Sequence, residues 1–316
     1  MKAIVQNGYG SPDALELKEV DVPVVKDDAV LVRVHAAALH AGDYFIVRGV
    51  PYVSRFYGGW PKPRGYVPGL DVAGRVEAVG KRVTRLRPGD EVLGTPGRAC
   101  ANYVSAKEDR FVLKPARLTF EQAAAVSTSA LAALHGLRDA GKVKPGQKVL
   151  INGASGGVGT FAVQIAKAFG AEVTGVCGTR NVDLVRSIGA DHVIDYTQED
   201  FTRLGQRYDL ILDNVASPSF SELRRALTPS GKLIASSGHA GLGYFIMAFA
   251  LSAVVRQQGR PNFSSPNQRD LVVLKELIEA GKVTPVIDRT YPLSETPAAL
   301  AYVGARHARG KVVITI

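Results

Sequence analysis

Cysteine is scarce in this sequence, since the 316 residues contain only Cys100 and Cys177. Two cysteines exclude a disulfide framework of the kind that holds small secreted domains together. Long apolar runs are lacking as well: the longest, residues 244–255, is shorter than the roughly 20 residues needed to cross a bilayer. The first five residues alternate like a strand and lack the features of a signal peptide. We therefore expect a cytoplasmic protein with no membrane partner.

A dense basic block is also absent, although the formal net charge is +10. Lys and Arg are scattered along the chain, without the interleaved aromatic residues typical of a nucleic-acid site. We therefore expect a solvated basic surface and no nucleic-acid partner, while the positive field would favour an anionic small ligand. Apolar residues make up 46% of the chain, which is enough for a sizeable core.

The first hundred or so residues indicate β-structure. Residues 30–35 alternate with period 2, as in a half-buried strand. Gly and Pro separate further strand-like runs at 72–79, 91–93 and 103–105. A helical, Ala-rich segment then begins at Thr119, which is a suitable N-cap, and continues to about Ala140.

From residue 148 the chain alternates short β-branched runs with helical segments, which predicts an α/β fold with a doubly wound parallel sheet. Strands are predicted at 148–152, 172–177, 192–194, 208–213 and 232–236, and helices at 157–169, 182–188 and 219–227. A sixth strand is expected from the region around 240–265.

The C-terminal part predicts a helix at 269–280, a strand at 283–288, a helix at 294–307 and a last strand at 311–316. The length exceeds that of a typical single-core domain, so we predict two domains. The first would be discontinuous, with residues 1–122 and 266–316, because the last strand can rejoin the N-terminal β-domain. The second would comprise residues 123–265.

The strongest local signal is the glycine-rich turn of residues 153–159, between a predicted strand and a predicted helix. Ala154, Gly156 and Gly159 occupy the three positions of a G-x-G-x-x-G fingerprint, and Ser155, Gly157 and Val158 complete the turn. Small residues let backbone N–H groups approach a pyrophosphate at the helix N-terminus. The same turn also spells the G-x-S-x-G motif of hydrolases, which would need partners such as Asp213 and His239. That alternative explains neither Gly159 nor the preceding β-domain.

The end of the second predicted strand indicates which dinucleotide binds. An NAD site needs an acidic residue about 20 positions after the glycines, to bind the ribose hydroxyls. No carboxylate lies between Glu172 and Asp183, whereas Thr179 and Arg180 follow Gly178 and suit a 2′-phosphate. The sequence therefore favours NADPH.

Several motifs resemble one known family. Gly146, Gln147, Leu150, the turn of residues 154–159, Gln164 and Lys167 are similar to the signature of quinone oxidoreductases, the zeta-crystallin-like, zinc-independent branch of the medium-chain dehydrogenases/reductases. Residues 68–74, 79–80 and 88–92 look like the GroES-like catalytic domain of that superfamily, and residues 307–314 resemble its C-terminal strand motif. The resemblance covers nearly the whole chain. It implies a Rossmann domain plus a GroES-like β-rich catalytic domain built from both chain ends.

The resemblance also implies roles for individual residues. Those facing the pyrophosphate would be Gly156, Gly157, Val158 and Gly159; those around the adenosine phosphate would be Thr179, Arg180 and Tyr196. Asn214 and Val215 would line the ribose and nicotinamide, with Ser237 and Gly238 beneath the nicotinamide. Ala132 stands where the family often has Thr. Thr128, one turn earlier, would replace that contact.

Zinc ligands of the zinc-dependent relatives are missing. Those relatives carry a catalytic Cys, a Gly-His-Glu and a lobe of four cysteines. Here His40 lies near the first position, Leu70 replaces the His and Asp71 the Glu. Since a catalytic zinc needs about three protein ligands, we predict a site without metal, although His40, Asp43 and Asp71 form an imaginable set.

These features predict an NADPH-dependent reductase that transfers hydride to a quinone or an α,β-unsaturated carbonyl. His40, Asp43 and Tyr52 are the candidate catalytic residues, because the resemblance places them in the segment that lines the cleft in relatives. For each of them a structural hydrogen bond or packing is the favoured interpretation. The resemblance also implies a homodimer. A zinc-type alcohol dehydrogenase and a non-catalytic NADPH- or nucleic-acid-binding protein remain as alternatives.

Overall fold

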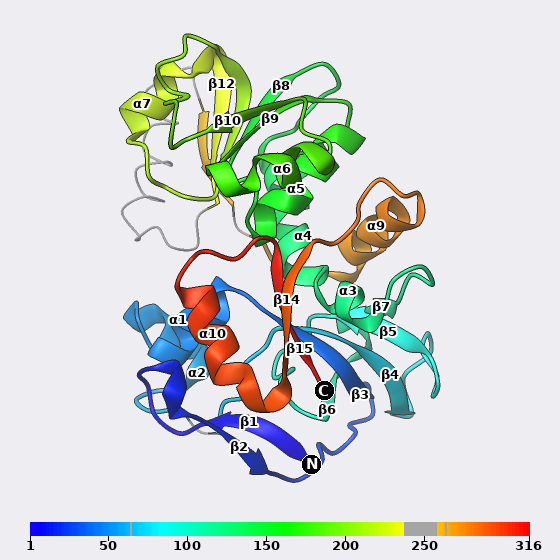
Figure 1. The fold of residues 1–316 in the computed structure, drawn as a ribbon. Coiled ribbons are helices and arrows are strands. Elements are labelled where there is room, and N and C mark those ends of the chain that lie inside the picture. The colour runs from blue at the N-terminus through cyan, green and yellow to red at the C-terminus, as the bar shows by residue number, and fades with distance from the viewer. Residues whose placement is uncertain (64, 237–257, 263) are drawn as a thin grey trace. The chain divides into compact units, whose positions relative to one another are not determined.

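A computed structural model describes residues 1–63, 65–236, 258–262 and 264–316 (Figure 1). The chain forms two compact units. The first contains Met1–Thr128, Pro266–Glu279 and Pro285–Ile316, and the second contains Ser129–Ser265 and Ala280–Thr284. Within the described ranges, no helix is long and apolar enough to span a membrane.

The first unit, called the catalytic unit below, is built mainly of β-strands. A hairpin of β1 (Lys2–Gln6) and β2 (Leu15–Glu19) lies beside a seven-stranded sheet. The sheet order is β14-β15-β3-β4-β5-β7, and β6 also pairs with β3. Its strands are β3 (Ala29–Leu39), β4 (Asp71–Val79), β5 (Glu91–Gly94), β6 (Tyr103–Lys107), β7 (Phe111–Leu113), β14 (Ile287–Pro292) and β15 (Lys311–Thr315).

Both chain ends meet in this sheet. Strand β15 pairs antiparallel with β3, with Val313 opposite Ala38. Helices of the unit are α1 (Ala41–Arg48), α2 (Arg55–Gly58), α3 (Phe120–Ala124), α9 (Gln268–Glu279) and α10 (Thr296–Gly304). The Val, Leu, Ile and Ala side chains of β1, β3, β4 and β15 form one core with Leu300 of α10, since alternate residues of each strand face the same side.

The second unit, called the cofactor unit below, contains a six-stranded sheet in which every adjacent pair is parallel. Its order is β10-β9-β8-β11-β12-β13. The strands are β8 (Lys148–Asn152), β9 (Glu172–Cys177), β10 (His192–Asp195), β11 (Tyr208–Asp213), β12 (Leu227–Ala235) and β13 (Gln258–Pro261). The helices α5 (Gly157–Ala168), α6 (Val182–Ser187) and α7 (Phe220–Arg225) alternate with them. The predicted doubly wound sheet is confirmed, including its sixth strand.

Strand order fixes where such a sheet binds a ligand. The connections reverse direction between β8 and β11, which lie side by side in the sheet. In open parallel sheets the ligand crevice lies at the carboxyl ends of the strands that flank this reversal. The glycine-rich turn follows β8, and Asn214 follows β11. Both therefore stand at the expected edge.

Two strands begin well away from their predicted first residue. Strand β12 begins at Leu227 rather than 232, because Leu227 pairs with Tyr208 ahead of a register shift. The strand predicted at 283–288 is Ile287–Pro292. Residues before it are held in the cofactor unit, where the Gln164 side chain bonds both the N–H and the carbonyl of Thr284 at 2.7 and 2.9 Å. These bonds use the backbone groups that a sheet partner would need.

The connecting helical segment begins as predicted at Thr119. Its hydroxyl accepts from the Gln122 N–H at 3.2 Å, and the Gln122 side chain accepts from the Thr119 N–H at 3.1 Å. This capping box starts α3, after which α4 (Ser127–Leu134) continues into a π-helical turn, η4 (His135–Ala140).

Candidate functional site

Backbone conformation and close packing shape the glycine-rich turn. Gly153 has a φ of 77°, which favours glycine, and the Ala154 N–H donates to the Val176 carbonyl at 2.9 Å. A Cβ on Gly159 would lie 2.1 Å from the Gly153 carbonyl oxygen. The third glycine therefore lets the first turn of α5 pack directly on the turn that precedes it.

The start of α5 suits an anion. Gly156 is the N-cap, so no side chain caps the first N–H groups of this 12-residue helix. Among the described residues, a Cβ on Gly156 would meet only the Gly153 oxygen, at an ordinary 3.5 Å, so these residues leave the space above the turn open. Ser155, Gly156, Gly157 and Val158 are each partly exposed there. Uncapped N–H groups and the helix dipole both favour a pyrophosphate at this point.

The end of β11 offers an unsatisfied amide. The Asn214 Nδ2 donates to the Asn152 carbonyl at 3.1 Å, while its Oδ1 is buried without a hydrogen-bond partner in the described part of the chain. Val215, next to it, is about half exposed. A buried acceptor at the switch point of the sheet fits a hydroxyl or amide donor of a bound dinucleotide. Ser237 and Gly238 lie outside the described residues.

Gly178, Thr179 and Arg180 follow β9 and are at least partly exposed. A Cβ on Gly178 would lie 3.3 Å from the Tyr196 hydroxyl, so the exposed Tyr196 ring lies against this glycine. The Thr179 Oγ1 is 2.9 Å from the Thr197 Oγ1. Arg180 and Tyr196 thus belong to one exposed surface at the carboxyl ends of β9 and β10.

Sequence reasoning missed Asp195 on this surface. Its Oδ1 accepts from the Thr197 N–H at 3.0 Å and from the Thr197 hydroxyl at 2.8 Å. Hydrogen bonds from Thr179 and Thr197 hold the pKa of Asp195 below its usual value, so the carboxylate is charged. The sequence pattern of an NAD site concerns only the residues after β9, whereas the sheet brings the end of β10 beside them.

The contacts of Ser155 and Asp213 give the hydrolase alternative no support. The Ser155 Oγ accepts from the Asn181 Nδ2 at 3.1 Å. The Asp213 carboxylate accepts from the Asn152 side chain at 2.8 Å and from the Val215 N–H at 3.1 Å, so it orders the loop after β11. His239, the third member of that set, lies outside the described residues.

In the catalytic unit, His40 and Asp43 together cap α1. The His40 Nδ1 accepts from the Gly42 N–H at 2.9 Å. Asp43, fully buried, accepts from the His40 N–H at 3.0 Å and from the Gly69 N–H at 2.9 Å. Burial raises the pKa of Asp43 to about 6. Each of its oxygens accepts a backbone N–H, so Asp43 ties the start of α1 to the loop before β4.

The proton of His40 is assigned by these contacts. Since Nδ1 accepts a backbone N–H, the neutral ring carries its hydrogen on Nε2. The Nε2 atom is buried and, among the residues described, has no hydrogen-bond partner; the Asp43 Oδ2 is too far, at 3.6 Å. Burial, with a contribution from the Lys311 charge, lowers the pKa of His40 to about 4. His40 is therefore neutral near pH 7 and keeps an unused N–H donor.

A buried ion pair lies at the start of β4. The Lys311 Nζ is 3.8 Å from the Asp71 Oδ2 and donates to the Leu39 carbonyl at 3.2 Å. Asp71 also accepts from the Thr128 N–H at 3.0 Å and from the Thr128 hydroxyl. Burial raises the pKa of Asp71 and lowers that of Lys311, while each charge opposes the shift of the other. The Thr128 hydroxyl thus donates its hydrogen to Asp71, and its oxygen can still accept a hydrogen bond from a ligand.

Comparisons with known proteins agree with this geometry. Residues 26–135 match the alcohol dehydrogenase GroES-like domain, and residues 188–314 match the zinc-binding dehydrogenase family. A quinone-oxidoreductase homolog from Spinacia oleracea chloroplasts is 34% identical over 99% of this chain and 98% of its own. This chain belongs to the quinone oxidoreductase family of the medium-chain dehydrogenases/reductases.

Further relatives agree with this assignment. An NADPH-dependent alkenal/one oxidoreductase of Arabidopsis thaliana is 33% identical over 99% of this chain and 79% of its own. The structure of the quinone oxidoreductase from Coxiella burnetii aligns with a TM-score of 0.90, at 28% identity, over 100% of this chain and 99% of the other. The predicted Rossmann and GroES-like domains are therefore confirmed, and the family implies a nicotinamide cofactor.

Tyr52, the third catalytic candidate of this oxidoreductase, differs from His40 in its surroundings. Its side chain is 67% exposed. The Arg55 guanidinium lies over the Tyr52 ring, 4.6 Å from its centre. His40 alone among the three candidates combines a buried polar atom with an unused hydrogen-bonding group.

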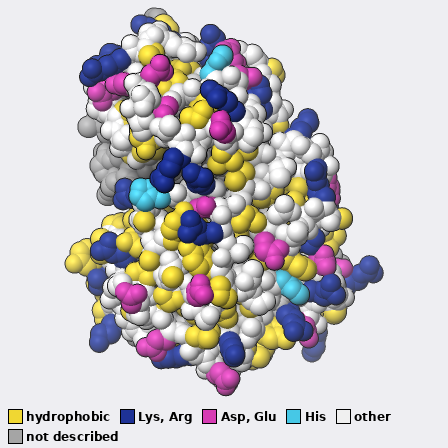
Figure 2. Space-filling model, in the orientation of Figure 1, with side chains coloured by type: hydrophobic (Ala, Val, Ile, Leu, Met, Phe, Trp, Pro, Cys, Tyr) yellow, Lys and Arg dark blue, Asp and Glu magenta, His cyan; other side chains and the backbone are white. Residues whose placement is uncertain are grey.

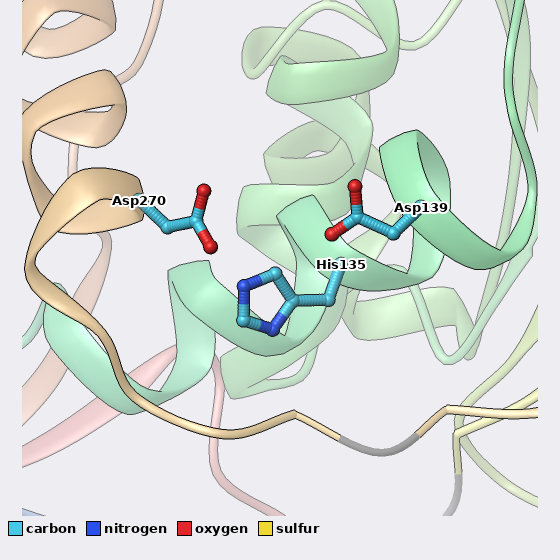
Figure 3. A group of neighbouring side chains, drawn as sticks. All are labelled: His135, Asp139 and Asp270. Carbon is cyan, nitrogen blue, oxygen red and sulfur yellow. The ribbon is translucent and has the colours of Figure 1, made fainter.

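Figure 3 shows three side chains with possible metal-ligand atoms, His135, Asp139 and Asp270. The first two belong to η4 of the cofactor unit and Asp270 to α9 of the catalytic unit. The His135 Nδ1 is 2.9 Å from the Ser264 Oγ, and the Asp139 carboxylate accepts from Arg138 at 2.6 and 2.8 Å. The Asp270 carboxylate accepts from the Asn267 side chain at 2.6 Å. Each of the three side chains thus has a hydrogen-bond partner within its own unit.

Proposed function

We propose that this chain is an NADPH-dependent reductase that transfers hydride to a quinone or an α,β-unsaturated carbonyl without zinc. Relatives named as quinone oxidoreductases and as an alkenal/one oxidoreductase support the acceptor class. The observation that carries the proposal is the buried pair of Lys311 and Asp71 beside a neutral His40. His40 would provide a polarising N–H group, and the Lys311–Asp71 pair a compensated charge, where zinc-dependent relatives use a metal.

The residues present do not fit a catalytic zinc. Leu70 and Asp71 stand where the zinc-dependent relatives have His and Glu. The Asp71 carboxylate has the Lys311 ammonium as counter-charge, and a dication beside that ammonium would be repelled. Asp43 accepts backbone N–H groups with both oxygens, and the His40 Nδ1 caps α1. This set lacks the three available ligands that zinc requires.

A nicotinamide dinucleotide does fit the cofactor unit. The open space above Gly156 and the uncapped start of α5 suit the pyrophosphate. The buried Asn214 Oδ1 can accept a hydrogen bond from a hydroxyl or amide of the cofactor. We assign Ala154 through Gly159, Gly178, Thr179, Arg180, Tyr196, Asn214 and Val215 to cofactor binding, with Thr128 from the catalytic unit and with Ser237 and Gly238. When bound, the cofactor supplies the hydride.

Arg180 is the basis for proposing NADPH over NADH. Its guanidinium is exposed beside Thr179, where a 2′-phosphate can accept charge-assisted hydrogen bonds. Asp195, hydrogen-bonded to Thr197 in the same surface, repels that phosphate. The preference therefore depends on Arg180 outweighing a neighbouring carboxylate.

His40 is proposed to act on the acceptor. In an acceptor that gains hydride at its electron-poor carbon, negative charge develops on the conjugated oxygen. The Nε2–H of neutral His40 can donate to that oxygen, as an oxyanion-hole donor does. With a pKa of about 4, His40 holds no extra proton near pH 7, so solvent supplies the proton that completes the reduction. Asp43 keeps the ring in place by capping α1.

The test is the rate of cofactor oxidation, followed through the absorbance of the reduced nicotinamide. A quinone and an enone are compared with a saturated ketone, each with NADPH and with NADH. We expect turnover of at least one conjugated acceptor, with NADPH preferred, and none of the saturated ketone. Absence of turnover with both conjugated acceptors would overturn the proposal. The homodimer and the cytoplasmic location remain predictions.

A further inference from the structure

Exposed aromatic side chains are concentrated in one short segment of the catalytic unit. Residues 50–60 include six large apolar side chains that are between 50% and 77% exposed: Val50, Tyr52, Val53, Phe56, Tyr57 and Trp60. Figure 2 shows hydrophobic and basic side chains side by side at the edge where Figure 1 draws α1 and α2. Apolar exposure of this density usually marks a surface that binds a partner or a membrane.

Arg55 holds this segment in its outward-facing conformation. Its guanidinium lies over the rings of Tyr9 and Tyr52, at 4.7 and 4.6 Å from their centres. Its Nε donates to the Gly49 carbonyl at 3.1 Å. The Phe56 and Trp60 rings stack at 6.2 Å. The exposed rings are therefore ordered by contacts within the segment and with Tyr9.

The segment and its flanks carry basic residues but no acidic ones. No Asp or Glu occurs between Asp43 and Asp71, whereas Arg48, Arg55, Lys62 and Arg64 all occur there. Arg48 and Lys62 are exposed at either end of the aromatic stretch. Aromatic rings flanked by Lys and Arg, without acids, are typical of side chains that enter the headgroup region of an anionic membrane.

We propose that residues 48–62 dock the protein peripherally on an anionic lipid bilayer. Val53, Phe56, Tyr57 and Trp60 enter the interface, and Arg48 and Lys62 contact lipid phosphates. Peripheral docking requires no membrane-spanning segment, so it is compatible with the short apolar runs of this chain. The proposal departs from the expectation, drawn only from those runs, that the protein has no membrane partner.

Trp60 gives a direct readout because it is the only tryptophan of the chain. The full chain is mixed with vesicles of phosphatidylcholine alone or of phosphatidylcholine with phosphatidylglycerol, and Trp60 emission, quenching by acrylamide and co-sedimentation are measured. We expect a blue shift, protection from acrylamide and co-sedimentation only with the anionic vesicles. Added salt should weaken all three, because surface charges are screened.

Three variants locate the contact. Lys62→Glu should weaken partition into anionic vesicles at least about five-fold, since each basic residue at such a surface contributes roughly that factor. Tyr57→Ser should weaken it as well, and Tyr57 is chosen because it does not stack on Trp60. The control is Val24→Ser, at an 85% exposed apolar residue outside the segment, which should bind like the parent chain.

Three results would overturn the proposal. One is an unchanged Trp60 emission with anionic vesicles. Another is equal binding by the Lys62→Glu and Val24→Ser chains. The last is a blue shift that grows with protein concentration in the absence of lipid, which would show that a second copy covers the segment. None of these measurements involves cofactor or acceptor, so the outcome is independent of the proposed reaction.

Discussion

The two ring nitrogens of His40 have different partners, and single substitutions can separate their roles. Nδ1 caps α1 through the Gly42 N–H, whereas the Nε2–H is unused in the described structure. Asn is a good N-cap residue and can replace the first function but has no group at the position of Nε2. His40→Ala removes both functions.

We predict that His40→Asn lowers kcat/KM for the acceptor roughly a hundred-fold, the loss typical of one oxyanion-hole donor, with little change in Tm. His40→Ala should lose the same activity and in addition about 1 kcal/mol of stability, because the cap is gone. Steady-state kinetics and thermal unfolding of both variants check this. A fully active His40→Asn chain would show that the ring serves only the helix.

The pH profile adds a second check on the same residue. Because its pKa is lowered to about 4, His40 stays neutral through the range in which a free imidazole, with a pKa of 6.5, would titrate. The pH profiles of kcat/KM of the parent enzyme and of His40→Asn should therefore have the same shape near the pKa of a free imidazole. An inflection there in the parent enzyme alone would mean that a protonated His40 donates in the reaction.

Lys311 neutralises the buried Asp71, so its removal should be costly. Lys311→Met leaves an unpaired buried carboxylate, and we expect the free energy of unfolding of the catalytic unit to fall by about 3–5 kcal/mol. Adding Asp71→Asn removes that charge and still accepts from Thr128, so the double variant should recover part of the loss. Urea unfolding of the single and double variants measures the coupling; strictly additive losses would contradict a charge pair.

Arg180 and Asp195 should have opposite effects on cofactor choice. Arg180→Ala is expected to raise KM for NADPH about ten-fold or more, the value of a charge-assisted hydrogen bond, and to leave NADH unaffected. Asp195→Asn should lower KM for NADPH, because a negative charge near the 2′-phosphate is removed. The ratio of kcat/KM for the two cofactors reports both. Equal changes for NADPH and NADH in either variant would place the 2′-phosphate elsewhere.

At the scale of the element, the turn between β8 and α5 offers two glycines with different constraints. A Cβ on Gly159 would overlap the Gly153 oxygen at 2.1 Å, whereas one on Gly156 has an ordinary 3.5 Å contact and a φ of −82°. Gly159→Ala should therefore destabilise the cofactor unit. Gly156→Ala should fold normally but weaken dinucleotide binding, because its methyl group fills the space of the pyrophosphate.

Thermal unfolding and cofactor titration of the two glycine variants distinguish these effects. The matched pair differs by one methyl group at positions three residues apart, so each serves as the control of the other. Tight cofactor binding by a well-folded Gly156→Ala chain would contradict the assignment of the pyrophosphate to this turn.

Elements with strong local patterns were predictable from the sequence. The strands Lys148–Asn152, Glu172–Cys177 and Tyr208–Asp213 have the predicted bounds, because β-branched runs ended by Gly or a turn define them locally. The strand near residue 287 was misplaced. Its start depends on Gln164 binding Thr284, a contact 120 positions apart that no local pattern encodes.

For the whole molecule, the family and both domain types were also predictable. The glycine-rich turn and the motifs of residues 68–92 and 307–314 are each short, continuous stretches that can be recognised in the sequence alone. The site electrostatics were not. Lys311 appeared only as part of a strand motif, yet it binds the Leu39 carbonyl, 272 positions away, and pairs with Asp71. Asp195 likewise joins Thr179 only once β9 and β10 pair.

We propose above that hydride transfer in this oxidoreductase needs no zinc. The most direct measurement is NADPH oxidation by the full chain after treatment with a chelator, with and without added zinc, using the acceptor that the untreated enzyme reduces. We expect equal kcat in both samples, because in the proposed reaction Lys311 and His40 would supply the charge and the polarising donor. Activity that is lost on chelation and restored by zinc would contradict it.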